Sequence, residues 1–193
     1  MIFVESRKKK EKTLNAKYPN AIIIDLTSKS ESEYKVFSPF YPHGNIPVPF
    51  SHNIFSCSVE GVWQGLKVFE SNDVDTSKFN ITDMKGIKRS VRVFGKIKGH
   101  REGVNGIKIL DYKTARKEIF IKTYYWLLEN KLKKQVEKLA DLAKKRDIVL
   151  LDYETNTDIE NFNKPISHAG LVKHYIEKMH SVYKAPIQTR LDL

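Results

Sequence analysis

Two short apolar runs predict strands in the interior of a small sheet. Residues 21–27 (AIIIDLT) and 147–153 (DIVLLDY) are rich in Ile, Leu and Val, and charged or turn-forming residues flank each run. Uninterrupted apolar runs of this length are typical of strands that are covered on both faces, because an exposed face would introduce alternating polar residues. We therefore expect both strands to be buried.

Apolar residues at helical spacing predict further elements. The first helix follows Ser58, a favourable N-cap, and its apolar face reaches Phe69. Asp111 with Thr114 opens a long helical region that continues to about residue 145, and the β-branched residues at 121–123 predict a break into two helices. The last helix follows Ser167. The pattern predicts an α+β fold, a mainly helical domain with a small β-sheet.

Two segments lack a regular period. Residues 34–50 contain four prolines, so we expect an ordered, extended loop whose aromatic residues pack against the domain. Residues 84–106 contain five glycines and seven Lys or Arg, and we expect an irregular segment with a short helix near Lys88. No repeat or linker divides the chain. We expect one domain over residues 1–193, its core over about 20–182, between a basic N-terminal segment and a C-terminal tail.

Composition narrows the classes of protein. With 40% apolar and 30% charged residues, the chain has the composition of a folded protein. It contains no apolar run of membrane-spanning length and no signal-peptide pattern, so we expect a cytoplasmic protein without membrane contact. The single cysteine, Cys57, excludes an internal disulfide and a cysteine-based zinc cluster. The net charge of +11 predicts an anionic partner, such as nucleic acid, a nucleotide or a phosphorylated metabolite.

The first candidate for chemistry is a polar stripe on the predicted helix after Ser58. Glu60, Gln64 and Lys67 are spaced i, i+4 and i+7, which places them on one helix face. The stripe is either a solvated face or the floor of an active site. Gly61 and Gly65 favour close approach of a ligand or of another backbone, because an exposed face has no need of glycine. The helix dipole favours an ionised Glu60 unless burial opposes it.

The second candidate is the basic, glycine-rich segment. Glycine lets backbone N–H groups approach phosphate oxygens, and arginine supplies a two-pronged donor. We predict phosphate contacts from Arg89, Arg92 and Arg101. The segment matches neither a P-loop nor a dinucleotide-binding motif, and a flexible exposed loop is the alternative interpretation.

The third candidate is the polar loop after the second predicted strand. The strand delivers Asp152, Asn156 and Asp158 into this loop, and His168 stands at the start of the last helix. Such side chains commonly point into clefts, although turn formation and helix capping are the alternatives. The histidines lack ligand-like spacing, so we infer neither a metal nor a cofactor. We expect four aromatic residues of the long helical region to lie in the core or at an interface: Tyr112, Tyr124, Tyr125 and Trp126.

Two of these segments together resemble the NADAR family. In that family a loop of the type F-S-(N)-F-(Y)-P precedes a helix of the type S-x-E-H-x-x-Q-A-x-K-F. Here FSPFYP (residues 37–42) precedes SVEGVWQGLKVF (58–69), and Glu60, Gln64 and Lys67 occupy the matching positions. The order of the later segments is also similar. The chain departs from the family in having Gly where His is usual and in lacking Trp-Gly in the acidic loop, so it resembles a distinct branch.

The resemblance implies cleavage of the N-glycosidic bond in phosphoribosyl or ADP-ribosyl nucleobase compounds, and some members reverse ADP-ribosylation of guanine in DNA. Such cleavage develops positive charge on the ribose, which a carboxylate stabilises while it orients water. Glu60 is implied in that role, with Lys67 at a phosphate or at the departing base. The candidate substrate contacts are Ser38, Phe40, Tyr41, His43, Trp63, Gln64, Arg89, Arg92, Arg101, Asp152, Asn156, Asp158 and His168.

Two other classes of function are compatible with the sequence. One is a noncatalytic protein that binds ADP-ribose-like nucleotides, and the other is a basic protein that binds DNA or RNA. Glu60 beside Lys67 favours the enzyme, because a carboxylate gives a pure polyphosphate binder no advantage. Binding to nucleic acid would show a strong dependence on salt.

Overall fold

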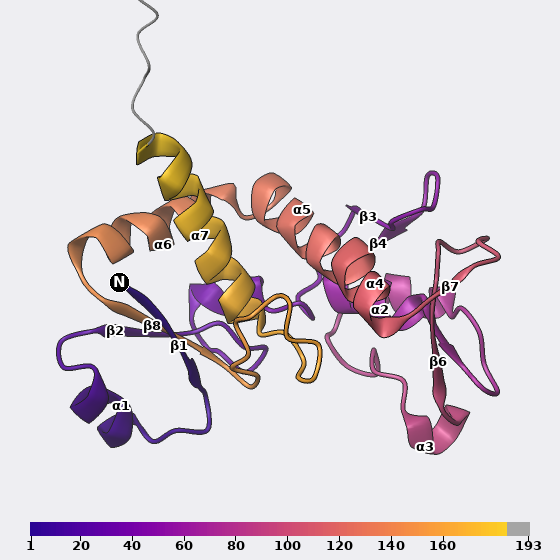
Figure 1. Cartoon of the computed structure of the whole chain (residues 1–193), viewed down its shortest axis with the longest axis horizontal. Helices are drawn as coiled ribbons and strands as arrows, with labels where there is room; N and C mark the ends of the chain where they lie inside the picture. The colour runs from indigo at the N-terminus through magenta and orange to yellow at the C-terminus, as the bar shows by residue number, and fades with distance from the viewer. Residues whose placement is uncertain (185–193) are drawn as a thin grey trace, which may run out of the picture.

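Three strands form a parallel sheet with β8 in the middle (Figure 1). The computed structural model describes residues 1–184. The strands are β1 (Ile2–Ser6), β2 (Ile22–Asp25) and β8 (Ile148–Asp152). All residues of β8 are buried, which confirms the prediction of an interior strand for the second apolar run.

The outer strands differ from the sequence prediction. β1 lies outside the predicted core of residues 20–182, yet it pairs with β8 and Ile2 is buried. The short apolar run at the N-terminus did not by itself predict a strand of the core, because β8, the strand with which it pairs, lies far away in the sequence. β2 lies at the edge of the sheet, so Ile24 is buried while Ile22 and Ile23 are only half-buried. The prediction of a buried strand there is therefore right only in part.

Three longer helices pack on one another, and one of them also packs on the parallel sheet. They are α5 (Lys122–Asn130), α6 (Lys133–Lys145) and α7 (His168–Lys184). α7 packs on β1 and β8 and also contacts α5 and α6. The predicted caps are confirmed at two positions: Ser167 Oγ accepts the Gly170 N–H at 3.1 Å, and Asp111 accepts the Thr114 N–H at 2.7 Å.

The predicted break in the long helical region lies at the wrong place. α4 (Tyr112–Ala115) continues through a π-helical segment (Arg116–Ile121) directly into α5, and the chain turns only at Lys131 and Leu132, before α6. The β-branched residues at 121–123 do not interrupt the helix, because Ile121 and Thr123 are buried in it. Tertiary packing here overrides a weak local preference.

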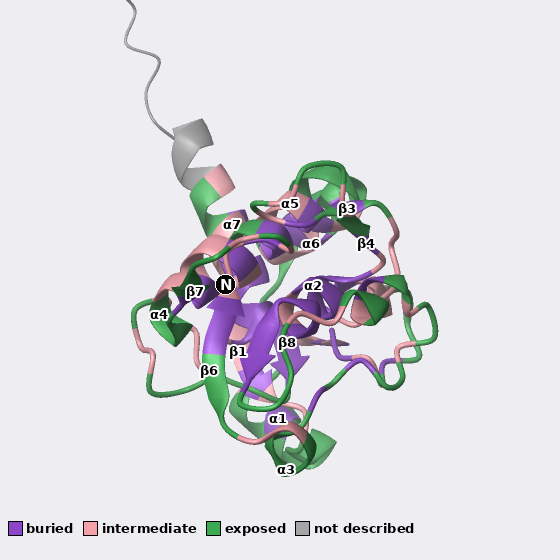
Figure 2. Cartoon of the chain, turned by 90° about the vertical axis from the view of Figure 1, so that its right-hand side faces the viewer, coloured by how far each residue is buried: buried purple, intermediate pink, exposed green. Residues whose placement is uncertain are grey.

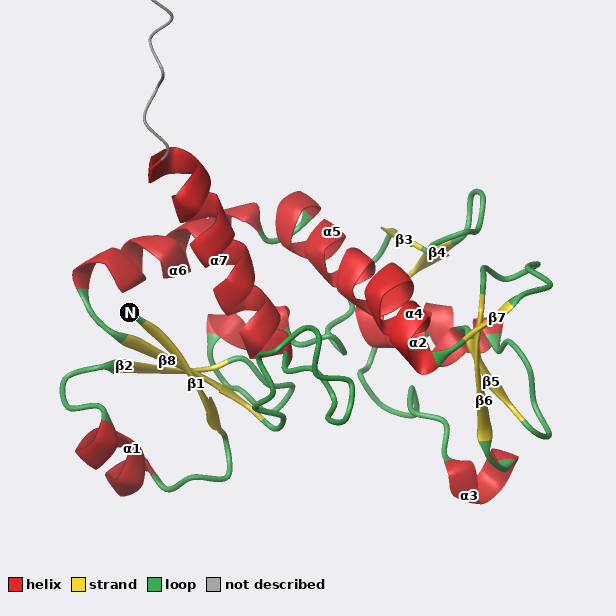
Figure 3. Ribbon diagram, viewed as in Figure 1, coloured by secondary structure: helices red, strands yellow, loops and turns green. Residues whose placement is uncertain are grey.

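A second, antiparallel sheet lies at the other end of the molecule (Figure 3). It consists of β5 (Lys67–Phe69), β6 (Ile97–Arg101) and β7 (Ile109–Leu110). The remaining elements are α1 (Glu11–Lys17), β3 (Ile46–Pro47), β4 (Phe55–Ser56), α2 (Val59–Gly65), α3 (Val91–Phe94) and 3₁₀-helices at Glu33–Phe37 and Thr76–Asn80. The segment 84–106 contains the short helix α3, close to the one predicted near Lys88, but the strand β6 corrects the prediction that the rest of the segment is irregular.

α2 is shorter than its apolar period predicts. Ser58 caps it as expected, by accepting the Gly61 N–H at 3.0 Å, but the helix ends at Gly65. Lys67 and Phe69, predicted on the helix, lie on β5 and pair with β6. The pairing partner is distant in sequence, so the helical spacing alone could not reveal it.

One hydrophobic core joins the two sheets and the helices between them into an α+β fold. It includes Ile2 and Leu150 of the parallel sheet, Val62 of α2, Leu127 of α5 and Leu171 of α7. Figure 2 shows α2 and β8 largely buried, so the motif helix lies inside the molecule. Within residues 1–184, every helix is too short or too polar to cross a membrane.

Candidate active site

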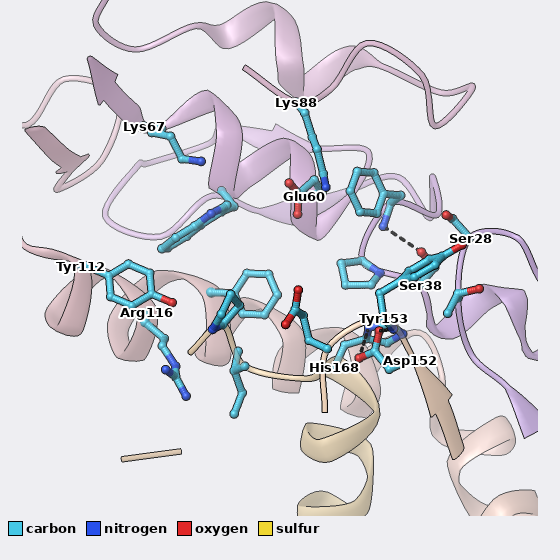
Figure 4. Close-up of a pocket in the computed structure, with 18 of the residues that line it drawn as sticks. Ser28, Ser38, Glu60, Lys67, Lys88, Tyr112, Arg116, Asp152, Tyr153 and His168 are labelled. Atoms are coloured by element: carbon cyan, nitrogen blue, oxygen red, sulfur yellow. Dashed lines mark hydrogen bonds and ion pairs between the residues drawn. The ribbon is translucent and has the colours of Figure 1, made fainter. Parts of the chain in front are cut away.

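A cavity of about 400 Å³ lies where the two halves of the molecule meet. α2 and β5 line it on one side, the helix from α4 through the π-helical segment on another, and the ends of β8 and α7 on a third. Figure 4 shows Glu60, Lys67 and Lys88 on one side of this pocket and Asp152 and His168 across from Glu60.

Glu60 is held at the pocket by a hydrogen bond from its backbone and by Gln64 of the same motif. It is 8% exposed, and its backbone N–H donates to the Pro39 carbonyl at 2.8 Å, which joins α2 to the FSPFYP loop. Gln64 Nε2 donates to Glu60 Oε1 at 2.8 Å, and Gln64 Oε1 accepts the Arg89 backbone N–H at 3.1 Å. Gln64 therefore orients the carboxylate, and Arg89 fixes the direction of the Gln64 amide.

The electrostatics of Glu60 and Lys67 bring their pKa values closer together. Burial raises the pKa of Glu60, against the opposing effects of the Gln64 hydrogen bond and of Lys67 and Lys88. Burial lowers the pKa of Lys67, although Glu60 counteracts it. Burial thus opposes the ionisation that the helix dipole favours in Glu60. Both groups are suited to gain or lose a proton during a reaction.

The lysines approach the pocket from two different elements. Lys67 comes from β5, and its Nζ lies 5.7 Å from the centre of the Trp63 ring. Lys88 comes from the segment before α3, and its Nζ lies 5.3 Å from the centre of the Phe40 ring. Figure 4 shows the end of Lys88 beside the Glu60 carboxylate. Sequence reasoning missed Lys88, although its basic segment had been singled out.

The three arginines predicted to bind phosphate lie outside the pocket. The Arg89 guanidinium is buried and donates to the carbonyls of Gln64, Lys67 and Asp73. Arg101 donates to both carboxylate oxygens of Asp73, at 3.0 and 2.5 Å. Arg92 is exposed on α3. Arg89 and Arg101 are thus held by groups of the protein itself, and this structure does not bring them together with Glu60.

Asp152 and His168 form a buried ion pair across the pocket from Glu60. Asp152 Oδ2 accepts from Ser167 Oγ at 2.7 Å and lies 2.9 Å from His168 Nδ1, while His168 Nε2 lies 3.0 Å from the Leu26 carbonyl. Since both ring nitrogens face acceptors, the imidazole donates from both and is protonated. Burial lowers the pKa of His168, but Asp152 outweighs burial and raises it.

The other polar residues of the acidic loop maintain the loop itself. Asn156 Nδ2 donates to the carbonyls of Asn161 and Lys164, and Asp158 Oδ1 accepts the Glu160 N–H at 2.9 Å. These contacts are those of turn-forming residues, and both side chains lie outside the pocket. The loop still contributes to the site through four residues that sequence reasoning missed: Tyr153, Glu154, Pro165 and Ile166.

Arg116 is a further residue that sequence reasoning missed. It lies in the π-helical segment, lines the pocket and is buried. Its guanidinium donates to three carbonyls of the acidic loop, those of Asp158, Asn161 and Lys164, at 2.8 to 3.1 Å. Arg116 therefore fixes the loop against the helix, and no local sequence pattern distinguishes it from exposed basic residues nearby.

Aromatic side chains form much of the pocket wall. Three of the candidate substrate contacts line the pocket: Ser38, Phe40 and Trp63. Tyr41 and His43 lie outside it, and the His43 ring is held against the Val36 carbonyl at 2.8 Å.

Two aromatic residues of the long helical region have different positions. Tyr124 is in the core as expected, and its hydroxyl donates to the Phe37 carbonyl at 2.7 Å. Tyr112, predicted in the core or at an interface, is 42% exposed and lines the pocket instead.

The glycines of α2 serve packing between protein segments. A Cβ on Gly61 would lie 2.6 Å from Ser56 Oγ and 2.7 Å from the Lys78 carbonyl. A Cβ on Gly65 would lie 2.2 Å from the Phe79 ring. Of the two reasons for glycine left open by the sequence, the close approach of another protein segment is therefore the right one.

The part of the chain that matches a protein-family model contains the elements that position the site. A family model matches residues 6–172, from the end of β1 into α7. The chain belongs to DUF6939, a family of unknown function. No curated protein matches the chain. Among the side chains of residues 1–179, no three His, Cys, Asp or Glu are placed to hold a metal ion.

Proposed function

We propose that this protein is an N-glycosidase that acts on an ADP-ribosyl or phosphoribosyl nucleobase compound. The observation that carries the proposal is the Glu60 carboxylate, buried at an aromatic-walled pocket, oriented by Gln64 and flanked by Lys67 and Lys88. The resemblance of the FSPFYP loop and the Glu-Gln-Lys motif to the NADAR family supports the same activity. The Pro39 contact, which links these two motifs in space, adds a structural reason to treat them as one site.

The proposed chemistry assigns a role to each charged group. As the bond between ribose and base breaks, its electron pair leaves with the base nitrogen and positive charge develops on the ribose. Glu60 stabilises that charge and accepts a proton from the attacking water, which completes the hydrolysed sugar. Its raised pKa suits it to this proton transfer. Lys67 and Lys88 bind anionic groups of the substrate or stabilise the departing base.

The size and lining of the pocket suit a nucleotide-like substrate. The cavity of about 400 Å³ lies in the range of small-molecule sites, which combine apolar walls with a few oriented polar groups. Phe40, Trp63 and Tyr112 offer flat surfaces for a base or ribose. The cations that meet the substrate in this proposal are the two lysines, in place of the arginines that the sequence suggested.

The test is release of free base or sugar. The protein is incubated with DNA that carries ADP-ribosylated guanine or thymine, and with ADP-ribose, NAD and phosphoribosylamino-pyrimidines. We expect wild type to turn over one of these compounds and Glu60→Gln to be slower by about 100-fold or more. Glu33→Gln is the matched control, because Glu33 is 59% exposed and pairs with Lys138.

Two results would contradict the proposal. If wild type and Glu60→Gln cleaved a compound at the same rate, Glu60 would have no catalytic role. If no compound were cleaved while ADP-ribose still bound, the protein would be a noncatalytic nucleotide-binding protein. Binding of unmodified DNA or RNA with a steep dependence on salt, and without cleavage, would favour the nucleic-acid-binding alternative.

A further inference from the structure

One buried cation beside the pocket takes no part in the proposed chemistry. Arg116 is 1% exposed, lines the pocket and lies at the start of the π-helical segment. Figure 4 shows its guanidinium pointing away from Glu60, so it is not placed to meet the reacting bond. All of its hydrogen bonds run to backbone carbonyls of the acidic loop, residues 153–166. Any role of Arg116 at the pocket therefore acts through this loop.

The chain bears a free-energy cost at Arg116. Burial of a guanidinium is expensive, and backbone carbonyls do not neutralise its charge. Nε is also buried and has no hydrogen-bond partner among the described residues. Packing alone therefore does not explain an arginine at this position. What an arginine adds is a fixed geometry, because its planar fork holds several acceptors in defined directions at once.

The acidic loop is closed at its base and tied at its middle. At the base, the Ser167 N–H donates to the Asn156 carbonyl at 2.9 Å. At the middle, Arg116 and the Asn156 side chain donate to the same two carbonyls. These carbonyls belong to Asn161 and Lys164. Compact loops with adjacent ends frequently have a function, and these ties hold this loop in one shape.

The loop lines the pocket at both of its ends, with Tyr153, Glu154, Pro165 and Ile166. Lys164, whose carbonyl accepts from Arg116 at 3.1 Å, directly precedes the second pair. The Phe162 ring covers the guanidinium, with its centre 4.9 Å from the guanidinium carbon. A loop released from Arg116 would therefore move one wall of the pocket. Glu60 would stay in place, because its own anchors lie on α2 and on the FSPFYP loop.

The π-helical segment aligns Arg116 with its neighbours along the pocket. Tyr112, Arg116 and Phe120 line the pocket at a spacing of four residues. In an α-helix this spacing overshoots a full turn by about 40° at each step, so such a row drifts away from one face. The wider turns over Arg116–Ile121 take up the overshoot. Because π-turns within α-helices are frequent at functional sites, they independently support a role for this face.

We propose that Arg116 is a positioning residue that holds the acidic loop in the shape that binds substrate. The loop is a preformed wall of the pocket, and Arg116 sets the substrate affinity through the loop, without touching the substrate. A preformed wall avoids the entropic cost of ordering a loop at each binding event. The inference rests on the proposed function for the choice of ADP-ribose as ligand, but the rigidity of the loop is measurable without any ligand.

The experiment compares Arg116→Met and Arg116→Lys with wild type. Hydrogen exchange measures opening of the loop, calorimetry measures the Kd for ADP-ribose, and KM and kcat are measured for any compound that wild type cleaves. Lys117→Met is the matched control, because Lys117 pairs with Glu160 of the same loop at 2.7 Å but lies outside the pocket. Asn156→Ala loosens two of the same carbonyls and replaces Arg116→Met if that variant does not fold. Thermal unfolding checks the folding of each variant.

We expect Arg116→Met to speed hydrogen exchange in the loop by about tenfold or more, and to leave exchange in α6 unchanged. The Kd for ADP-ribose and the KM should rise by about tenfold or more, while kcat should fall by less than about threefold, because Glu60 keeps its anchors. Arg116→Lys keeps the charge with fewer donors and should lie between the two. Asn156→Ala should act in the same direction, and Lys117→Met should stay within about twofold of wild type, since a surface ion pair contributes little.

Other results would overturn the inference. Unchanged loop exchange in folded Arg116→Met would show that Arg116 does not hold the loop, and faster exchange with an unchanged Kd would show that the loop is no part of the binding wall. A lower kcat with an unchanged KM would mean only a smaller folded fraction.

The same measurements separate this inference from the proposed function. Turnover that depends on Glu60, with a KM indifferent to Arg116, would leave the proposed function standing and this inference refuted. Weaker ADP-ribose binding by Arg116→Met, without cleavage of any compound by wild type, would support this inference while the proposed hydrolysis fails. If wild type neither bound ADP-ribose nor cleaved any compound, both would be refuted.

Discussion

Replacement of Arg89 by methionine tests whether this arginine stabilises the fold or binds substrate. The guanidinium donates to the carbonyls of Gln64, Lys67 and Asp73 at 3.1, 2.6 and 2.8 Å, and also to the Asn72 side chain. These acceptors belong to the end of α2, to β5 and to the loop after it. The ring centres of Phe69 and Phe94 lie 4.8 and 5.2 Å from the guanidinium carbon.

The magnitude follows from these contacts. Hydrogen bonds from a charged donor each contribute about 1.5–3 kcal/mol, but the cost of burying the guanidinium offsets much of the sum. Removal of one partner from a buried charged network typically costs about 3–5 kcal/mol. Methionine fills the volume of the arginine stem yet leaves the carbonyls unpaired. We therefore expect Arg89→Met to lower the free energy of unfolding by about 3–5 kcal/mol, and Tm by about 6–20 °C.

The assay is chemical denaturation followed by circular dichroism, with Arg92→Met as the matched control. Arg92 is exposed on α3, so its replacement should change the free energy of unfolding by less than about 0.5 kcal/mol. If Arg89→Met were within about 1 kcal/mol of wild type while it lost affinity for ADP-ribose, the structural role would be refuted. The phosphate contact predicted from the sequence would then be correct.

Three further predictions concern stability and pH. Gly65→Ala should destabilise the fold by about 1–3 kcal/mol in denaturant titrations, because the new Cβ meets the Phe79 ring at 2.2 Å; an unchanged midpoint would show that the ring moves freely. Asp152→Asn should lose most stability between pH 3.8 and 6.5, the ordinary pKa values of Asp and His. The loss should shrink as pH falls through the lowered pKa of Asp152, and also as pH rises through the raised pKa of His168. A loss of stability that is independent of pH would contradict the ion pair. Turnover should fall as pH drops through the raised pKa of Glu60, above its ordinary 4.5, and a rate profile flat down to pH 4.5 would exclude Glu60 as the base.

The sequence predicted the local elements better than their ends. The caps at Ser58, Asp111 and Ser167 and the interior strand β8 are confirmed, because capping and continuous apolar runs depend on neighbouring residues. The predicted ends of elements were wrong where pairing with a distant strand determines the end of the element. Gly65 ends α2 because the next residues pair with β6, which the period of apolar positions cannot register.

For the candidate site, the sequence predicted the motif residues better than the other residues of the pocket. The motif identified Glu60, Gln64 and Lys67, and the structure brings these three together, although Lys67 reaches the pocket from a strand. The arginines were predicted as phosphate contacts from their charge. An arginine that binds a ligand and an arginine that is bound by carbonyls of the protein have the same charge, so the sequence could not distinguish them. Lys88, next to Arg89 in sequence, lies over the Phe40 ring and lines the pocket.

The sequence by itself determined the interior strand β8, the helix caps, the basic charge and the short motif that contains Glu60, since each follows from residues close together along the chain. Only the tertiary structure decided that Gly61 and Gly65 serve packing, that Asp152 pairs with His168, and that the buried Arg116 holds the acidic loop at the pocket. The physical reason is that burial sets the pKa values and the unpaired groups, and burial depends on contacts between segments far apart in the chain.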